Sequence, residues 1–262
     1  MKRLLAGYLV LISIVTTALG ASGKQPAPPG SLEGAPAQYT RFSVAELERG
    51  FLALAFGSDL RIGAPPLGIR RFDHPIHARV IGGGTVDRTD SMSRVIEEYA
   101  RAVPNLELSI APSTAAAEIE LRLIDEKDFR SALQAAFGAR IAKTFVARTD
   151  PQCMTSVRSS VDGKIVHSVS FIIVDKGDNV FRDCAYHELL HAFGLSNHDQ
   201  HNPWTTLNQK RMVGYLTGYD RSLLTLLYDT PRIRPGMTVR QARAVLPRAI
   251  AELGLAAPKP VR

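Results

Sequence analysis

The sequence predicts a single α+β domain, and three observations support this expectation. The chain has 262 residues, of which 45% are hydrophobic and 22% charged, a size and composition typical of one substantial globular domain. Helix and strand patterns are mixed along the chain without the regular alternation of a parallel α/β fold. The Gly and Pro residues are spread out, which excludes collagen-like and low-complexity architectures, and no repeat period is present.

The first 20 residues have the pattern of an export signal. The segment 1–20, MKRLLAGYLVLISIVTTALG, has a basic start, an apolar stretch and small residues at its end, so we expect cleavage after Gly20. The alternative is an uncleaved anchor, but the apolar run is short of the roughly 20 residues that a spanning helix needs. We expect an exported protein, periplasmic or extracellular, with no stable membrane span after cleavage.

A linker and a tail are predicted to flank the domain. Residues 21–38 are rich in Pro and Gly, as in an extended linker. The domain is expected over 39–254, followed by a C-terminal tail over 255–262. Its first helix begins after Ser43, because Ser43-x-x-Glu46 forms a capping box, and it ends near Gly57.

Hydrophobic periodicity and turn residues predict the remaining elements. The clearest is the strand in which Ile119, Leu121 and Leu123 alternate with charged residues, so one of its faces is buried. In chain order the predicted elements are a strand at 77–81, a helix at 91–102, strands at 106–110 and 117–124, a helix at 128–137, a strand at 164–174, a helix that ends at Gly194, a helix at 220–228, and a helix from the capping box at Thr238 to Gly254.

The two cysteines, Cys153 and Cys184, both lie in the part that we expect to be exported. In an oxidising compartment two lone cysteines most often pair, here closing a loop of roughly 30 residues, which would stabilise the fold by about 3–4 kcal/mol. A thiolate metal site is disfavoured because neither cysteine belongs to a CxxC pair.

The charge pattern argues against nucleic acid as a partner. The chain carries 32 Lys and Arg against 25 Asp and Glu, a formal charge of +7. These charges are interspersed, with no basic run and no ladder of alternating basic and aromatic residues.

The segment His187-Glu188-Leu189-Leu190-His191 is an HExxH motif on a predicted helix. Histidines four residues apart lie on one helical face, so both imidazoles can reach a single metal ion. Neutral imidazole suits Zn²⁺, which lowers the pKa of a bound water towards ~7. Glu188 would take the proton of that water as it attacks a carbonyl. A glycine three residues after the motif, Gly194, strengthens the prediction of a metal site.

The string CAYHELLHAFGLSNHD over 184–199 resembles the metzincin metallopeptidases. In that clan HExxHxxG continues to a third metal ligand just past the glycine turn. This chain departs from the pattern, because Asn197 occupies the usual third-ligand position and an amide is a poor zinc ligand. A turn that is one residue longer would direct His198 at the metal, and His201 and Asp199 are the alternatives.

Metzincins also place a methionine-containing turn beneath the metal and close the domain with a helix. Here Leu207, within 205–208, stands where that methionine would fall. The resemblance therefore implies a zincin-like single domain, in which a mixed twisted sheet packs on the HExxH helix and the C-terminal part is helical.

A narrower resemblance covers roughly 152–253. Both cysteines, the turn at Gly194 and the segment 226–237 are similar to a family of exported proteobacterial proteins of unknown function. Many of its members lack the HExxH histidines, which this chain retains. The resemblance favours pairing of the two cysteines and His198 as the third ligand, and it implies no known substrate.

These observations predict an exported zinc-dependent peptidase in which Glu188 is the general base and Zn²⁺ the cofactor. Its partner would be a peptide or protein substrate, and an amidase acting on cell-wall peptides would share the same chemistry. The alternative is an inactive or weakly active envelope binding or structural module on a zincin scaffold, which the departures at Asn197 and Leu207 favour. The retained Glu188 argues against it, because a structural zinc has no use for a general base.

Overall fold

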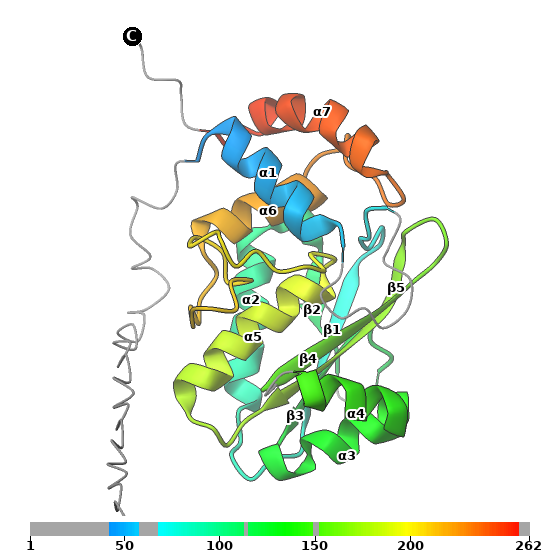
Figure 1. The fold of residues 1–262 in the computed structure, drawn as a ribbon, viewed down its shortest axis with the longest axis vertical. Helices are drawn as coiled ribbons and strands as arrows, with labels where there is room; N and C mark the ends of the chain where they lie inside the picture. Colours follow the sequence, from blue (N-terminus) through cyan, green and yellow to red (C-terminus); the bar gives the residue numbers. More distant parts are fainter. Residues whose placement is uncertain (1–41, 58–67, 113–114, 149–151, 257–262) are drawn as a thin grey trace, which may run out of the picture.

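The computed structural model describes residues 42–57, 68–112, 115–148 and 152–256 (Figure 1). The predicted signal peptide, the linker and most of the tail lie outside these residues. The described chain forms one α+β domain with a five-stranded mixed sheet, which confirms the predicted fold class. None of the described helices is long and apolar enough to cross a membrane.

The sheet has the strand order β2-β1-β3-β5-β4. Its strands are β1 (Ile76–Gly82), β2 (Leu108–Ile110), β3 (Ile119–Ile124), β4 (Cys153–Ser159) and β5 (Ile165–Ile173). Four of them run parallel, and β4 pairs antiparallel with β5 at one edge. In β3 the alternating apolar residues are buried as predicted.

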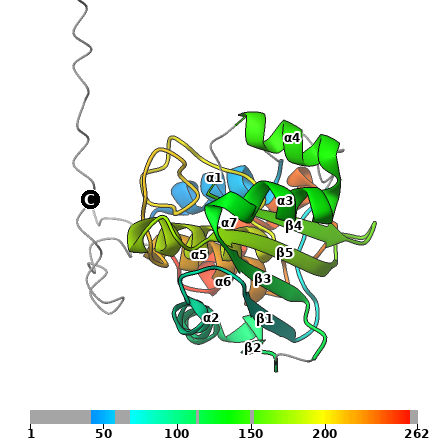
Figure 2. The ribbon, with the colours of Figure 1, turned by 90° about the horizontal axis from the view of Figure 1, so that it is seen from below.

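Helices cover both faces of the sheet (Figures 1 and 2). On one face lie α2 (Thr89–Ala102) and α5 (Asp178–Ala192), and on the other lie α3 (Glu126–Phe137) and α4 (Ala139–Arg148). The domain has two hydrophobic cores, and strand β5 contributes side chains to each. Ile172 belongs to the main core with α5, whereas Phe171 and Ile173 pack in a smaller core with α3 and α4. This alternation follows from the period of two in a strand, and it leaves α5 buried between the sheet and other helices.

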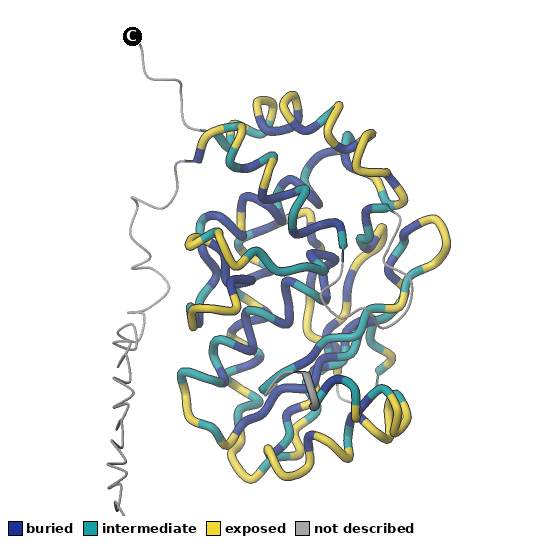
Figure 3. The backbone as a smooth tube through the Cα atoms, viewed as in Figure 1, coloured by how far each residue is buried: buried dark blue, intermediate teal, exposed yellow. Residues whose placement is uncertain are grey.

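The C-terminal part is helical, and it packs with the first helix. In Figure 1, α1 (Val44–Ala55), α6 (Gly218–Tyr228) and α7 (Val239–Glu252) gather at one end of the domain. The capping boxes predicted at Ser43 and Thr238 are both present. Tyr219 of α6 donates its hydroxyl to the carbonyl of Glu46 at 2.9 Å and so ties α6 to α1. Figure 3 shows the exposed residues of α7 on its outward side.

Helix α4 and strand β4 were not predicted from the sequence, and neither was a short 3₁₀ helix, η3 (Pro104–Leu106). Strand β4 has the sequence CMTSVRS, whose small and polar residues give little hydrophobic alternation. The Asp162-Gly163 pair is typical of a hairpin turn and would have indicated a strand before it, β4, that pairs with β5. Gly163 has φ +84° and joins β4 to β5.

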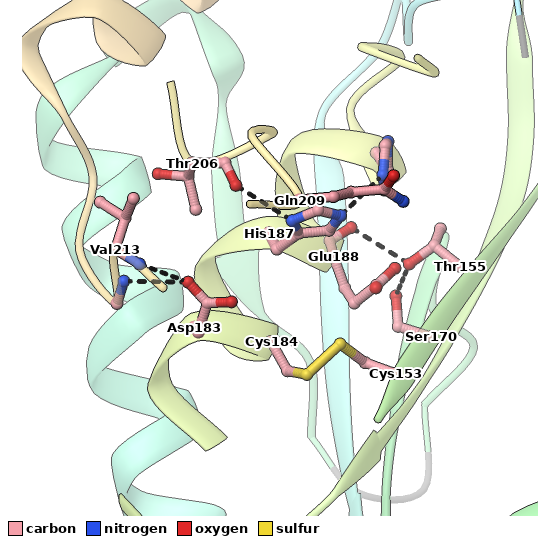
Figure 4. The surroundings of a disulfide bond; sticks show 12 residues. Cys153, Thr155, Ser170, Asp183, Cys184, His187, Glu188, Thr206, Gln209 and Val213 are labelled. Carbon is pink, nitrogen blue, oxygen red and sulfur yellow. Dashed lines mark hydrogen bonds between the residues drawn. A yellow bond between two sulfur atoms is a disulfide. The ribbon is translucent and has the colours of Figure 1, made fainter. Parts of the chain in front are cut away.

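The predicted disulfide between Cys153 and Cys184 is confirmed. The two sulfur atoms are 2.04 Å apart, and the bond spans 31 residues of sequence. It joins the first residue of β4 to the middle of α5, so it fastens the edge strand of the sheet to the helix that carries HExxH (Figure 4).

Candidate metal centre

Helix α5 presents both histidines of the HExxH motif near its C-terminal end. The chain then turns sharply at Gly194, where φ is +111°. A Cβ atom at this position would lie 2.1 Å from the carbonyl oxygen of Arg70, so only glycine fits. The turn lets the chain return past the end of α5, where His198 meets the two helical histidines.

The three histidines converge through the same ring atom. The Nε2 atom of His187 lies 2.8 Å from Nε2 of His198 and 3.1 Å from Nε2 of His191, and the remaining pair is also 3.1 Å apart. Among the described residues, they form the one group of three or more His, Cys, Asp or Glu side chains that could hold a metal ion.

Backbone carbonyls set the tautomers of the two helical histidines. Nδ1 of His187 lies 3.1 Å from the carbonyl oxygen of Thr206, and Nδ1 of His191 lies 2.6 Å from that of Leu195. A carbonyl only accepts, so each Nδ1 carries the proton and each Nε2 presents a lone pair. Burial is the main cause that lowers the pKa of His187 to about 3 and the pKa of His191 well below its ordinary value, so both rings are neutral.

The Nε2 lone pairs of His187 and His191 face each other at 3.1 Å and repel, and a proton on Nε2 of His198 can form a good hydrogen bond to only one of them at a time. A cation at the centre removes the repulsion, and three imidazoles with an open fourth position are the donor set of a catalytic zinc site. For zinc–nitrogen bonds of 2.0–2.1 Å, tetrahedral geometry places the nitrogens about 3.3 Å apart, slightly more than observed here. The residues therefore fit a zinc ion after a small outward adjustment.

The other residues considered for the third-ligand role lie outside this group. His201 is exposed, and its backbone N–H donates to the Asp199 side chain at 3.1 Å. Asn197 has a structural role: its side-chain amide donates to the carbonyl of Ala53 at 3.0 Å, and its backbone N–H donates to that of Leu54 at 3.1 Å. Both contacts fasten the turn to the end of α1, and the next residue, His198, meets His187 and His191.

Glu188 lies on the flank of α5 that faces the sheet edge (Figure 4). Only 3% of its surface is exposed, and its Oε2 atom is buried without a hydrogen-bond partner. Burial is the main cause that raises the pKa of its carboxyl to about 8. The neighbouring hydroxyls are those of Thr155, which donates to the backbone carbonyl of Glu188 at 3.2 Å, and of Ser170, 2.6 Å from that of Thr155. The raised pKa makes the ionised form of this carboxyl a stronger base, and its free Oε2 atom is the position at which it can accept a proton.

The family described as "Protein of unknown function (DUF2927)" matches residues 44–248, which include every residue of the centre. The chain belongs to this family. No curated protein and no solved structure matches it.

In this DUF2927 protein, the loop beneath His187 is held by one buried carboxylate. Asp220, fully buried on α6, accepts hydrogen bonds from the Thr205 hydroxyl at 2.5 Å, the Thr206 backbone N–H at 2.8 Å and the Thr217 hydroxyl at 2.8 Å. Thr206 is the residue whose carbonyl orients His187. Leu207, also fully buried, packs in the main core. Sequence reasoning missed Asp220, although its place at the start of a helix was predicted.

We expect Asp220→Ala to weaken both the fold and the metal centre. Removing the carboxylate leaves the buried donors of Thr205, Thr206 and Thr217 unsatisfied, at a cost of about 1–3 kcal/mol for each such group. Loss of the support behind a metal ligand typically lowers metal affinity by about 10–100-fold. Urea unfolding and competition with a zinc chelator measure the two effects. Arg221→Ala, at the exposed neighbouring position of α6, is the control and should change neither. Unchanged zinc affinity in Asp220→Ala would show that the loop does not depend on Asp220.

Proposed function

We propose that this chain is an exported zinc-dependent metallopeptidase. The observation that carries the proposal is the convergence of three histidine Nε2 atoms within 3.1 Å of one another, next to the buried carboxyl of Glu188. His187, His191 and His198 would hold the zinc ion, and Glu188 would be the general base. The disulfide supports export, because such bonds persist in oxidising compartments.

Each residue has a defined role in peptide hydrolysis. When bound, zinc supplies Lewis-acid chemistry, which polarises a substrate carbonyl and lowers the pKa of a water molecule. Glu188 accepts the proton of the attacking water at its free Oε2 atom and passes it to the leaving nitrogen. Thr206 and Leu195 hold two of the histidines in the tautomer that presents Nε2. The hydroxyl of Thr155 fixes the backbone of Glu188 against β4.

Zinc content tests this proposal directly. The mature wild-type protein, purified and dialysed in zinc-containing buffer and then freed of excess metal, should contain one zinc ion per chain by elemental mass spectrometry. His191→Ala and His198→Ala should each lose it, because two remaining imidazoles bind far more weakly. His201→Ala is the matched control and should keep the metal, since its ring lies outside the group of three. A wild-type protein without zinc would overturn the peptidase proposal and favour a binding module on this scaffold.

A further inference from the structure

The side chain of Gln209 lies beside the three histidines, although pattern analysis gave it no role. Its amide nitrogen, Nε2, is 3.4 Å from Nε2 of His198, and Figure 4 shows the side chain next to the ring of His187. The three histidines are half-buried, whereas Gln209 is exposed. Gln209 therefore lies on the side of the candidate centre that is open to solvent, from which a substrate would enter.

The backbone that leads to Gln209 is fixed by hydrogen bonds. The residue before it, Asn208, is buried and donates from its side-chain amide to the carbonyl of Asn202 at 2.7 Å. The carbonyl of Leu207 accepts a hydrogen bond from the backbone N–H of Asp199 at 3.1 Å. The loop that carries Gln209 is thus paired with the loop of the third histidine, so the two side chains start from a fixed separation.

The orientation of the Gln209 amide follows from its contact with Gln200. Nε2 of Gln200 donates to Oε1 of Gln209 at 3.2 Å, so the nitrogen of the Gln209 amide faces His198 and its oxygen faces Gln200. An amide nitrogen donates hydrogen bonds and does not accept them. Gln209 thereby directs an N–H at the group of ring nitrogens that is suited to hold a cation.

The contact between Gln209 and His198 is not compatible with a metal ion at this centre. A ring nitrogen that binds zinc uses its lone pair for the metal and can no longer accept a hydrogen bond. The N–H of Gln209 then needs a different acceptor at the same place. The carbonyl oxygen of a peptide bound at the centre provides one.

We propose that Gln209 is a catalytic residue that donates its amide N–H to the carbonyl oxygen of the peptide bond that is cleaved. This inference rests on the proposed function, because it adds a residue to the same reaction. As the oxygen of the attacking water bonds to the carbonyl carbon, one electron pair of the C=O bond moves to the carbonyl oxygen, which becomes negatively charged. A donor that is held in place beforehand stabilises this charge most strongly in the transition state.

Three variants of the full mature chain test this role. Gln209→Leu removes the donor, and Gln209→Glu keeps the length of the side chain but has a carboxylate that only accepts. Gln134→Leu, at an exposed position of α3, is the matched control. Competition with a chelator measures zinc affinity, and isothermal titration calorimetry measures the affinity of each zinc-loaded protein for acetohydroxamate, a small anion whose oxygen atoms bind zinc. Hydrolysis of unfolded casein gives kcat and KM.

Gln209→Leu should keep the zinc affinity of the wild type, because the atom that faces the centre is not a metal ligand. Its affinity for acetohydroxamate should fall about tenfold or more, the usual effect of losing one hydrogen bond to a charged group. The value of kcat should fall by roughly 10² to 10³ with little change in KM. Gln209→Glu should lose at least as much acetohydroxamate affinity, because its carboxylate repels the anion, and Gln134→Leu should match the wild type throughout.

Unchanged acetohydroxamate affinity or unchanged kcat in Gln209→Leu would overturn the inference, and so would a zinc-loaded wild type that does not bind acetohydroxamate. A loss of zinc affinity in Gln209→Leu would also overturn it, because the amide oxygen would then be a metal ligand. Failure of the proposed function is a separate result, since it would be absence of zinc in the wild-type protein.

Discussion

Glu188→Gln is expected to leave the zinc ion in place while the rate of peptide hydrolysis falls by a factor of roughly 10² to 10⁴, the usual contribution of a general base. Glutamine has nearly the same shape as glutamate but cannot accept the proton of the attacking water. Glu188 is not one of the three converging residues, so metal content should not change. The measurement is release of peptides from an unfolded casein substrate, with zinc determined on the same samples.

The free energy of unfolding of the Glu188→Gln protein shows whether a loss of activity comes from the missing base or from a damaged fold. Burial disfavours the charged form of the Glu188 carboxyl, so the neutral amide should not lower the free energy of unfolding. Glu97→Gln, at an exposed position of α2, removes the same charge away from the centre and should retain full activity. A Glu188→Gln protein that keeps both its zinc and its wild-type rate would remove Glu188 from the mechanism.

The second large effect is expected from the disulfide. Replacing both Cys153 and Cys184 with Ala should lower the free energy of unfolding by about 3–4 kcal/mol, because the crosslink closes a loop across 31 positions and restricts the unfolded chain. For a domain of this size the melting temperature should fall by roughly 10 °C. Thermal unfolding followed by circular dichroism measures the change.

Reduction is the matched control for the disulfide. A reductant should lower the melting temperature of the wild-type protein by a similar amount and should have no effect on the double Ala variant. Because of where the bond lies, we also expect its loss to affect zinc binding. Cys184 lies three residues before His187 on α5, and Cys153 lies two residues before Thr155 on β4, so zinc affinity should also fall. A wild-type protein whose melting temperature does not respond to reduction would contradict the predicted contribution.

Local sequence signals were sufficient for most of the scaffold. Capping boxes at Ser43 and Thr238 placed the starts of α1 and α7 to the residue, because the cap is made by atoms only three positions apart. Alternation in β3 gave its buried face, and Gly194 marked the turn after α5. Strand β4 was missed because an edge strand of small and polar residues carries little hydrophobic pattern, and its place is decided by pairing with β5.

In the candidate site too, some residues were predicted from local sequence and others depend on long-range packing. Sequence alone placed His187, Glu188 and His191 on one helix, because a spacing of four residues is a local geometric property. It left His198, His201 and Asp199 as competing third ligands, since the spacing past a glycine turn does not determine where a loop points.

In the described part of the chain, the tertiary structure brings His198 to the two helical histidines and leaves His201 and Asp199 outside that group. Asn197 hydrogen-bonds to the end of α1, more than 140 positions away in the sequence, and this contact accompanies the placement of His198 at the metal centre. Asp220 was likewise invisible to pattern analysis, because its significance depends on the distant residues, Thr205 and Thr206, that it meets. The sequence by itself determined the helix with its pair of HExxH histidines and the disulfide partners, because these follow from local spacing and from the presence of only two cysteines. Long-range packing decided which third histidine meets that pair and how the loop beneath His187 is supported, because both depend on residues that are distant in the sequence.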